Sequence, residues 1–478
     1  MNIALINPPF LFPYANNVRP SQCLGLRSLS AILKTRGHSV TFIDALREDL
    51  RNIRPYANGY IAGLELPEIV RRVPSNTHLI GLSVPFSQLA PIAHDMISLL
   101  KSSFPSVQIV MGGVYPSTQP DLALSSQADY IVIGEGELVF TEIAAGQNPV
   151  NIRGVYANST DKYPLSFCPA DMISDLDNLP FIDYDIPGID HYFAVSPRAQ
   201  KGDTASIVTS RGCPYACEFC SIHPVYGRRW RARSSSNVLE EINLLHGRYG
   251  VKKIEFEDDN LTLDKERAAQ IFEGILRKNE KGAGIRWYTP NGIRIDTLSE
   301  ELISLMKRSG CESLVLALEH GDPEMLNYMN KKLDLDVAFR TIEWSVKYGM
   351  PYISLFVIVG YPGETAERFE RGLKYLKRIQ SLSSRIQLHP NIAQPYPGTK
   401  LLKECLARGY IKNQDIDNFL VRRDLMDTSL VVSITTPDFD AQEVFRRFHL
   451  LLSLSENPWK KALKHVVPQR LIHLLKRR

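Results

Sequence analysis

Three of the chain's seven cysteines fall within eight residues, in the stretch SRGCPYACEFCSIHP at positions 210–224. Cys213, Cys217 and Cys220 follow the spacing C-x3-C-x2-C. A structural zinc site needs four ligands, commonly from two cysteine pairs, and the sequence has no second C-x2-C pair. Three thiolates can instead hold a cubane iron–sulfur cluster and leave one iron open to another ligand. The motif therefore favours such a cluster over zinc or a chance grouping.

The other cysteines, Cys23, Cys168, Cys311 and Cys405, are scattered along the chain. Cys311 lies at a helix–strand junction and Cys405 lies among apolar residues of a helical pattern, so both are predicted to be ordinary buried side chains. An odd total with this scatter does not suggest a disulfide framework. The start MNIALINPPF has no basic region and is predicted to be a strand, not a signal peptide. A reducing cytoplasm is the expected setting.

Charge is distributed unevenly along the chain. The net charge is +4, but the last 22 residues hold seven Lys and Arg and no Asp or Glu, so the other residues sum to 4 − 7 = −3. The main body therefore gives no charge signal for nucleic acid. The basic tail is interpreted as a solvated helix that caps the preceding domain. The alternative is an interfacial helix at the inner face of an anionic membrane, which would suit a lipid substrate.

The hydrophobic pattern predicts an α/β protein. Residues 1–145 alternate short apolar runs with helical segments, which is typical of a Rossmann-like doubly wound sheet. Residues 146–200 have no period and are predicted to be an ordered surface linker. Residues 201–398 hold six strands in βα order and predict a partial (β/α)6 TIM-like barrel. Residues 399–478 are predicted to be a helical C-terminal region with the basic tail.

The expected elements are as follows. Strands of the first region are expected at 2–10, 38–45, 78–86, 107–114 and 128–136, with helices at 24–37 and 90–105. Strands of the barrel are expected at 205–210, 252–258, 285–293, 313–319, 352–360 and 385–394. Its helices are expected at 236–250, 265–280, 299–310, 336–349 and 365–380. In both sheets, ligands should bind at the carboxyl ends of the strands.

A cysteine loop of this spacing directly after the first barrel strand, with Arg211-Gly212 before it and Phe219 before the last cysteine, resembles the radical S-adenosylmethionine (SAM) superfamily. The resemblance implies a [4Fe–4S] cluster on the three cysteines and SAM on the open iron. It also implies cleavage of SAM to a 5′-deoxyadenosyl radical, with an electron donor such as flavodoxin or ferredoxin.

The same resemblance implies roles for residues at the other strand ends. Asp258 and Asp259 would bind the amino group of SAM, and Arg294 would meet its carboxylate or a substrate anion. Glu319 would contact the ribose, although His320 stands where the superfamily often has Ser. Gly360 would allow close approach on the adenine side. The alternatives are an exposed acidic turn for the two aspartates and a surface salt bridge for Arg294.

The first region resembles the cobalamin-binding domain of B12-dependent radical SAM enzymes. The stretches that carry this likeness are LGLRSLSAILKTRGHSVTFIDA, GLSVPFS, GGVYPST and GEGE. The D-x-H-x-x-G motif is absent, and Tyr115 stands where many relatives have His. The alternative is a domain that kept its fold and lost the cofactor. The contacts that the resemblance implies lie at strand ends: Ser83, Gly112, Gly113, Gly134 and Glu135.

The leading hypothesis is a cobalamin-dependent radical SAM enzyme that methylates an unreactive carbon of a lipid or natural-product intermediate. The alternative is radical cyclisation, ring contraction or oxidation without methyl transfer. A sensor without turnover is a third hypothesis. The intact strand-end residues and the absence of an output pattern in the sequence argue against it.

Overall fold

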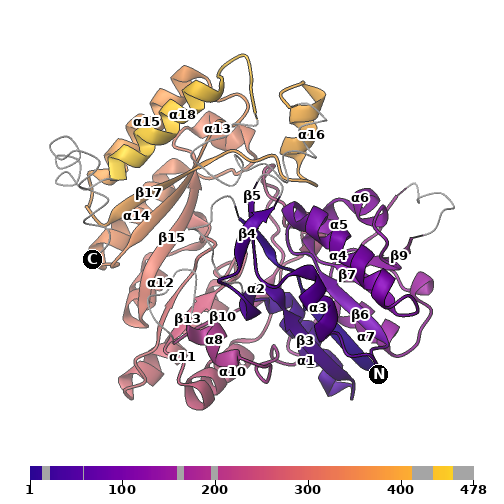
Figure 1. The fold of residues 1–478 in the computed structure, drawn as a ribbon. Coiled ribbons are helices and arrows are strands. Elements are labelled where there is room, and N and C mark those ends of the chain that lie inside the picture. Colours follow the sequence, from indigo (N-terminus) through magenta and orange to yellow (C-terminus); the bar gives the residue numbers. More distant parts are fainter. Residues whose placement is uncertain (13–21, 57–58, 159–165, 195–202, 412–433, 456–478) are drawn as a thin grey trace, which may run out of the picture.

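The computed structural model describes residues 1–12, 22–56, 59–158, 166–194, 203–411 and 434–455. Two parallel sheets dominate it, one in each half of the chain (Figure 1). The basic tail at 457–478, with both of its interpretations, lies outside the described residues. No helix in the described ranges is long and apolar enough to cross a membrane.

The first sheet has six strands in the order β3-β1-β6-β7-β8-β9, and only the pair β8–β9 is antiparallel. The strands are β1 (Asn2–Asn7), β3 (Ser39–Asp44), β6 (Leu79–Ser83), β7 (Gln108–Gly112), β8 (Tyr130–Val132) and β9 (Val155–Ala157). The five expected strands are confirmed. Strand β9 was missed because three residues are too few to show a period.

Helices cover both faces of this sheet, as the doubly wound prediction requires. Leu79 and Val110 pack with residues of α1 and α7, whereas their neighbours Ile80 and Ile109 pack with α3 and α4 on the other face. The helices are α1 (Leu24–Thr35), α2 (Ala45–Glu48), α3 (Leu66–Arg72), α4 (Ala90–Ser103), α5 (Val114–Thr118), α6 (Pro120–Leu124) and α7 (Glu137–Ala144), with 3-10 turns η1 (Ser87–Leu89) and η2 (Pro149–Asn151). A small antiparallel sheet, also missed, joins β2 (Phe10–Phe12), β5 (Gly59–Ala62) and β4 (Ile53–Tyr56).

The second sheet has six parallel strands in chain order, which confirms the partial barrel. They are β10 (Thr204–Ile207), β13 (Lys253–Phe256), β14 (Arg286–Tyr288), β15 (Cys311–Glu319), β16 (Ile353–Val359) and β17 (Ile386–Ile392). The five expected helices are present as α10 (Ser235–Tyr249), α11 (Lys265–Glu280), α12 (Glu300–Arg308), α14 (Leu335–Lys347) and α15 (Ala366–Gln380). Each begins after a side chain that caps its N-terminus: Ser234, Asp264, Ser299, Asp334 and Thr365. Shorter elements are α9 (His223–Tyr226), η3 (Ile295–Thr297) and α13 (Pro323–Tyr328).

The described part of the linker is more buried than a surface segment. Tyr184 is buried and donates a hydrogen bond to Glu241 of α10. Asp183 beside it accepts a hydrogen bond from Ser30 of α1. The linker, which includes α8 (Ile189–Ala194), therefore contacts both halves, and buried anchor residues such as Tyr184 alternate with exposed ones along it.

The C-terminal region contains α16 (Lys400–Ala407) and α18 (Ala441–Ser455). Helix α18 packs mainly on β17, the last strand of the barrel, and also touches α15 (Figure 1). Val444, Phe448 and Leu451 of this helix belong to the barrel core. The described part of this region therefore extends the barrel.

Candidate functional site

A short antiparallel hairpin closes the cysteine loop. Its strands are β11 (Ser210–Arg211) and β12 (Arg231–Ala232), and the loop between them carries the three cysteines and α9. Gly212, next to the first cysteine, has a φ of 83°. A Cβ atom there would lie 2.5 Å from the carbonyl oxygen of Arg229. Only glycine therefore fits where the chain turns into the loop.

The three cysteine thiols are half-buried and close enough to interact electrostatically. Burial, with a smaller contribution from the other two thiols, raises the pKa of Cys220 to about 12. In the described ranges, no three His, Cys, Asp or Glu side chains gather around a point where one metal ion would fit. A cubane cluster binds each thiolate through a different iron, so it does not need such a gathering. The donor set and the shared loop fit a cluster.

Residues 329 and 330 hold the cysteine loop in place, and they were not among the predicted site residues. The side-chain amide of Asn330 donates to the carbonyl of Ala216 at 2.8 Å, and the backbone N–H of Glu218 donates to the carbonyl of Met329 at 3.0 Å. Asn330 adopts a left-handed conformation with a φ of 54°. The polar run NKK indicates a loop, but it does not show that this loop contacts the cysteine loop.

Glu319, the expected ribose contact, lies at the end of β15 with a φ of 69°. Its carboxylate lies 3.0 Å from the ammonium of Lys331, and both side chains are buried. A bulky residue with positive φ is strained, and such strain is concentrated at functional sites. Burial raises the pKa of Cys217, and the charge of Lys331 opposes that effect. Lys331 therefore places a cation beside the cysteine loop.

Arg294 is buried, so its interpretation as a surface salt bridge is wrong. Its Nε atom lies 2.7 Å from an oxygen of Asp296, and its Nη2 donates to the carbonyl of Lys331 at 2.7 Å. The guanidinium also stacks 3.7 Å from the ring centroid of Tyr215, between the first two cysteines. Arg294 thus joins the end of β14 to the cysteine loop.

The two adjacent aspartates differ in their surroundings. Asp258 is buried and accepts hydrogen bonds from the hydroxyl of Thr209 at 2.7 Å and from Ser210. Asp259 lies against the cysteine loop, where burial and then the charge of Asp258 raise its pKa to about 7. The acidic turn is therefore not exposed. Asp259 has more capacity for a ligand than Asp258, whose carboxylate already accepts hydrogen bonds from Thr209 and Ser210 at the base of the cysteine loop.

Gly360 makes room for a helix. A Cβ atom at this position would lie 2.9 Å from the side chain of Val444 in α18. Its N–H donates to Glu364, which also lies 3.0 Å from His320 and 3.2 Å from Arg447 of α18. The close approach expected for adenine is made by this helix instead.

Several buried polar atoms have no hydrogen-bond partner among the residues described, and Oδ1 of Asn260 is one of them. The Nδ2 atom of Asn260 lies 4.0 Å from the sulfur of Cys213. An unmet buried acceptor costs free energy unless a ligand satisfies it. The amide of Asn260 therefore fits a polar ligand beside the cysteine loop.

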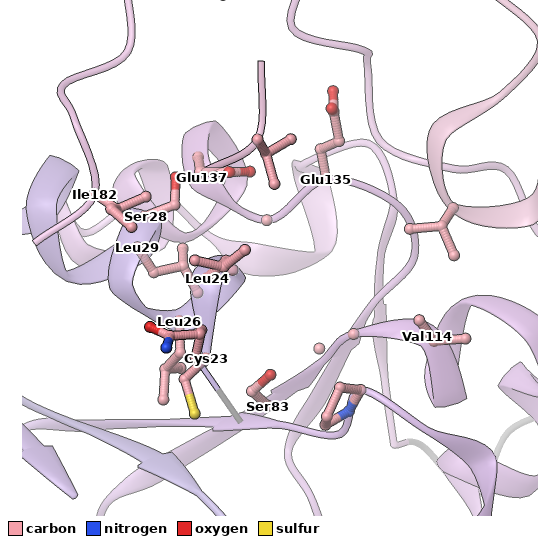
Figure 2. Close-up of a pocket in the computed structure, with 18 of the residues that line it drawn as sticks. Cys23, Leu24, Leu26, Ser28, Leu29, Ser83, Val114, Glu135, Glu137 and Ile182 are labelled. Atoms are coloured by element: carbon pink, nitrogen blue, oxygen red, sulfur yellow. Dashed lines mark hydrogen bonds between the residues drawn. The ribbon is translucent and has the colours of Figure 1, made fainter. Parts of the chain in front are cut away.

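A cavity of about 670 Å³ lies at the carboxyl ends of the first sheet. It opens where the strand order reverses between β1 and β6, the usual ligand position in such sheets. All five residues expected to contact cobalamin line it: Ser83, Gly112, Gly113, Gly134 and Glu135. In Figure 2, Ser83 lies at the sheet edge, with Glu135 and Glu137 on the opposite side of the cavity. Linker residues Leu176 and 179–182 and barrel residues such as Ser206 and Glu255 complete its wall.

Two details refine the cobalamin expectation. Tyr115 is buried and pairs with His94 at 3.0 Å, and it is not part of the cavity wall. The carboxylate of Glu135 forms ion pairs with Arg211 and Arg231 of the barrel. Only the main chain of this residue is therefore left to meet a ligand in the cavity.

Comparison with known families and structures agrees with this division. Residues 207–376 match the radical SAM superfamily, and residues 20–144 match the B12 binding domain. The chain is similar to an uncharacterised methyltransferase of Pyrococcus horikoshii, with 30% identity over 394 residues, covering 81% of this chain and 79% of the relative. It is 26% identical to cytidylyl-2-hydroxyethylphosphonate methyltransferase of Streptomyces wedmorensis, covering 86% and 83%.

Two further likenesses bear on the reaction and on the fold. An anaerobic magnesium-protoporphyrin IX monomethyl ester cyclase of Synechocystis is 29% identical, over 69% of this chain and 63% of the cyclase. The methyltransferase TsrM of Kitasatospora setae, solved with cobalamin and a [4Fe–4S] cluster, superposes with a TM-score of 0.66 at 18% identity. That match covers 85% of this chain and 78% of TsrM. At this identity it shows the shared fold.

Proposed function

The chain belongs to the cobalamin-dependent radical SAM methyltransferase family, and we propose that it methylates an unreactive carbon of a small molecule bound between its two halves. One observation carries the proposal. The cavity of about 670 Å³ at the end of the B12-binding sheet is lined by both halves, and the cysteine loop starts at its wall with Arg211. Methyl donor and radical source would thus meet the same substrate.

The residues present fit the cofactors of the family. Cys213, Cys217 and Cys220 would hold the cluster, and the small residues at the ends of β6, β7 and β8 would receive cobalamin. We assign the polar groups of SAM to Asp259 and to the neighbourhood of Arg294, Lys331 and Asn260. When bound, the cluster with SAM supplies a hydrogen-abstracting radical, and cobalamin supplies the methyl group.

The linker has a definite task in this scheme. Leu176, Leu179, Phe181 and Ile182 line the cavity and put apolar side chains over it. A radical intermediate must be kept from water and from stray hydrogen donors. The linker residues provide that cover, while Met329 and Asn330 keep the cysteine loop in position.

The electron donor and the substrate can be proposed only by chemical class. A radical SAM enzyme needs a small-molecule substrate and a reductant. We propose a flavodoxin- or ferredoxin-like donor for the electron. For the substrate, we propose a lipid or a natural-product intermediate, because Leu176, Leu179, Phe181 and Ile182 of the linker give this side of the cavity an apolar lining.

Radical cyclisation or oxidation without methyl transfer is the second candidate, because a cyclase is among the relatives. Product analysis separates the two. The protein is reconstituted anaerobically with iron, sulfide and hydroxocobalamin, and then receives SAM and reductant. About four irons and one cobalt per chain, with both 5′-deoxyadenosine and S-adenosylhomocysteine formed, would support methylation. Cobalt with 5′-deoxyadenosine alone would favour the second candidate, and a chain that takes up no cobalt would overturn the methylation proposal.

A further inference from the structure

The base of the cysteine loop carries two arginines that face each other. Arg211 and Arg231 are direct partners in the β11–β12 hairpin. Like charges in this position repel and destabilise a hairpin. The pair therefore needs an anion, and that anion comes from the other half of the molecule.

Glu135 of the B12-binding domain bridges the two arginines. Its Oε1 lies 3.0 Å from Nη1 of Arg211, and its Oε2 lies 2.6 Å from Nη1 of Arg231. Glu137 adds a contact of 2.7 Å to Nη2 of Arg211. The carbonyl of Ile173, in the linker, accepts a further bond from Arg231 at 2.7 Å. Both ends of the cysteine loop are thus fixed to one turn of the neighbouring domain.

These contacts are buried. The side chain of Arg211 is 12% exposed, and those of Glu135 and Arg231 are 2% exposed. In such surroundings charges are weakly screened, and removing one partner leaves another charge without compensation. The arrangement is therefore a rigid connection.

The same turn forms part of the cavity wall. Residues 134–137 line the cavity between the end of β8 and the start of α7. The N–H of Gly134 donates to Ser117 at 3.0 Å, which holds the turn from its own side. A ligand that presses on this turn acts on residues bonded directly to the base of the cysteine loop.

We propose that Glu135 is a positioning residue that couples the two cofactor sites, so that cobalamin in the cavity and the cluster on the cysteine loop each strengthen the binding of the other. This inference rests on the proposed function, because it takes cobalamin as the occupant of the cavity. Coupling between two binding sites is reciprocal, so either cofactor can report it.

The test measures the Kd of hydroxocobalamin for the full-length protein, with and without its reconstituted cluster. We expect the cluster to tighten cobalamin binding about tenfold in the wild type, within the usual range of such coupling. In Glu135→Gln the two Kd values should become equal. Asp129→Asn is the matched control, because Asp129 pairs with Lys101 in the same domain, away from the cysteine loop. It should keep the wild-type ratio.

A spectroscopic readout separates positioning from a general loss of structure. With excess reductant present, so that the cluster stays reduced and the added cobalamin is reduced as well, the g values of the cluster's own EPR signal should shift on cobalamin binding in the wild type and in Asp129→Asn, but not in Glu135→Gln. If Glu135→Gln fails to fold, Arg231→Lys serves instead, since it keeps the charge and should weaken the coupling. Equal Kd ratios in wild type and variant would overturn the coupling alone. No binding of hydroxocobalamin to the wild type would overturn the proposed function with it.

Discussion

The two parallel sheets differ at the edges that face the site. The first sheet ends in small residues around open space, and a Cβ atom at Gly112 would meet no atom nearer than 4.0 Å. The barrel ends in charged side chains that already pair within the chain, such as Glu319 with Lys331. One edge is left open to receive a large cofactor. The other is filled with contacts that fix the loop on which the cluster would be built.

The largest effect is expected at the cysteine loop itself. Replacing Cys213, Cys217 or Cys220 by Ala should abolish cluster binding, because each removes one of three protein ligands. Cys311→Ala and Cys405→Ala should keep the iron content, since both thiols are buried in the barrel core. Iron and sulfide analysis after anaerobic reconstitution measures this. Equal loss of iron in all five variants would contradict the assignment.

The second largest effect is expected at the barrel edge, where charged side chains pair with each other. Lys331→Met leaves Glu319 as a buried carboxylate without its cation and should cost about 3–5 kcal/mol of the free energy of unfolding. Lys347→Met is the matched control, because Lys347 pairs with Glu300 on the surface and should cost no more than about 1 kcal/mol. Urea unfolding of cluster-free protein measures both. Similar costs would show that burial does not distinguish this edge.

A substitution at the open end of the first sheet should weaken ligand binding without unfolding the protein. Gly112→Leu puts a side chain into the cavity and should weaken hydroxocobalamin binding about 5- to 150-fold, the effect of about 1–3 kcal/mol of overpacking. Gly247→Leu adds the same group on α10, where a Cβ atom meets nothing within 4 Å, and should leave the affinity unchanged. A Kd by absorbance titration decides it. An unchanged Kd in Gly112→Leu would contradict the assignment of cobalamin to this cavity.

The smallest effect is expected at α18, which packs against the barrel edge. Hydrogen bonds from Arg446 and then Arg447 lower the pKa of Glu443 to about 2 from the ordinary value of 4.5. A lowered acid pKa stabilises the fold above the ordinary value, and this contribution is lost as pH falls from 4.5 towards 2. Glu443→Gln should remove this part of the acid sensitivity, by less than about 1 kcal/mol. The free energy of unfolding, measured at neutral and at acid pH for the variant and the wild type, checks this. A variant as acid-sensitive as the wild type would contradict it.

The sequence was most informative where the signal was local. Apolar strand runs and helical periods depend on neighbours along the chain, and they predicted both sheets. The cysteine spacing is equally local, and it predicted the cluster loop. Gly112 and Gly134 were predicted from their place directly after strands, and no atom comes closer than 3.4 Å to a Cβ atom built at either one. All five residues predicted at the first sheet line the cavity.

Charged residues were harder to place, because their partners are distant in sequence. Asp258 and Asp259 are adjacent, yet one bonds to Ser210 and the other faces the cysteine loop. Gly360 was expected to face a ligand, but its neighbour Val444 comes from a helix 84 positions later. Lys331 was missed for the same reason. A pairing across the fold has no signature in a single sequence.

The contact of α18 with β17 affects whether the edge of the barrel sheet can pair with a strand of another molecule. β17 is the last strand of an incomplete barrel, and such an edge offers backbone groups to any passing strand. The hydroxyl of Ser455, at the end of α18, accepts from the N–H of Leu388 at 2.6 Å and lies 3.4 Å from its carbonyl. The helix thus occupies hydrogen-bonding groups that would otherwise be free to pair. Its docking guards the molecule against edge-to-edge aggregation while the cofactors are still being loaded.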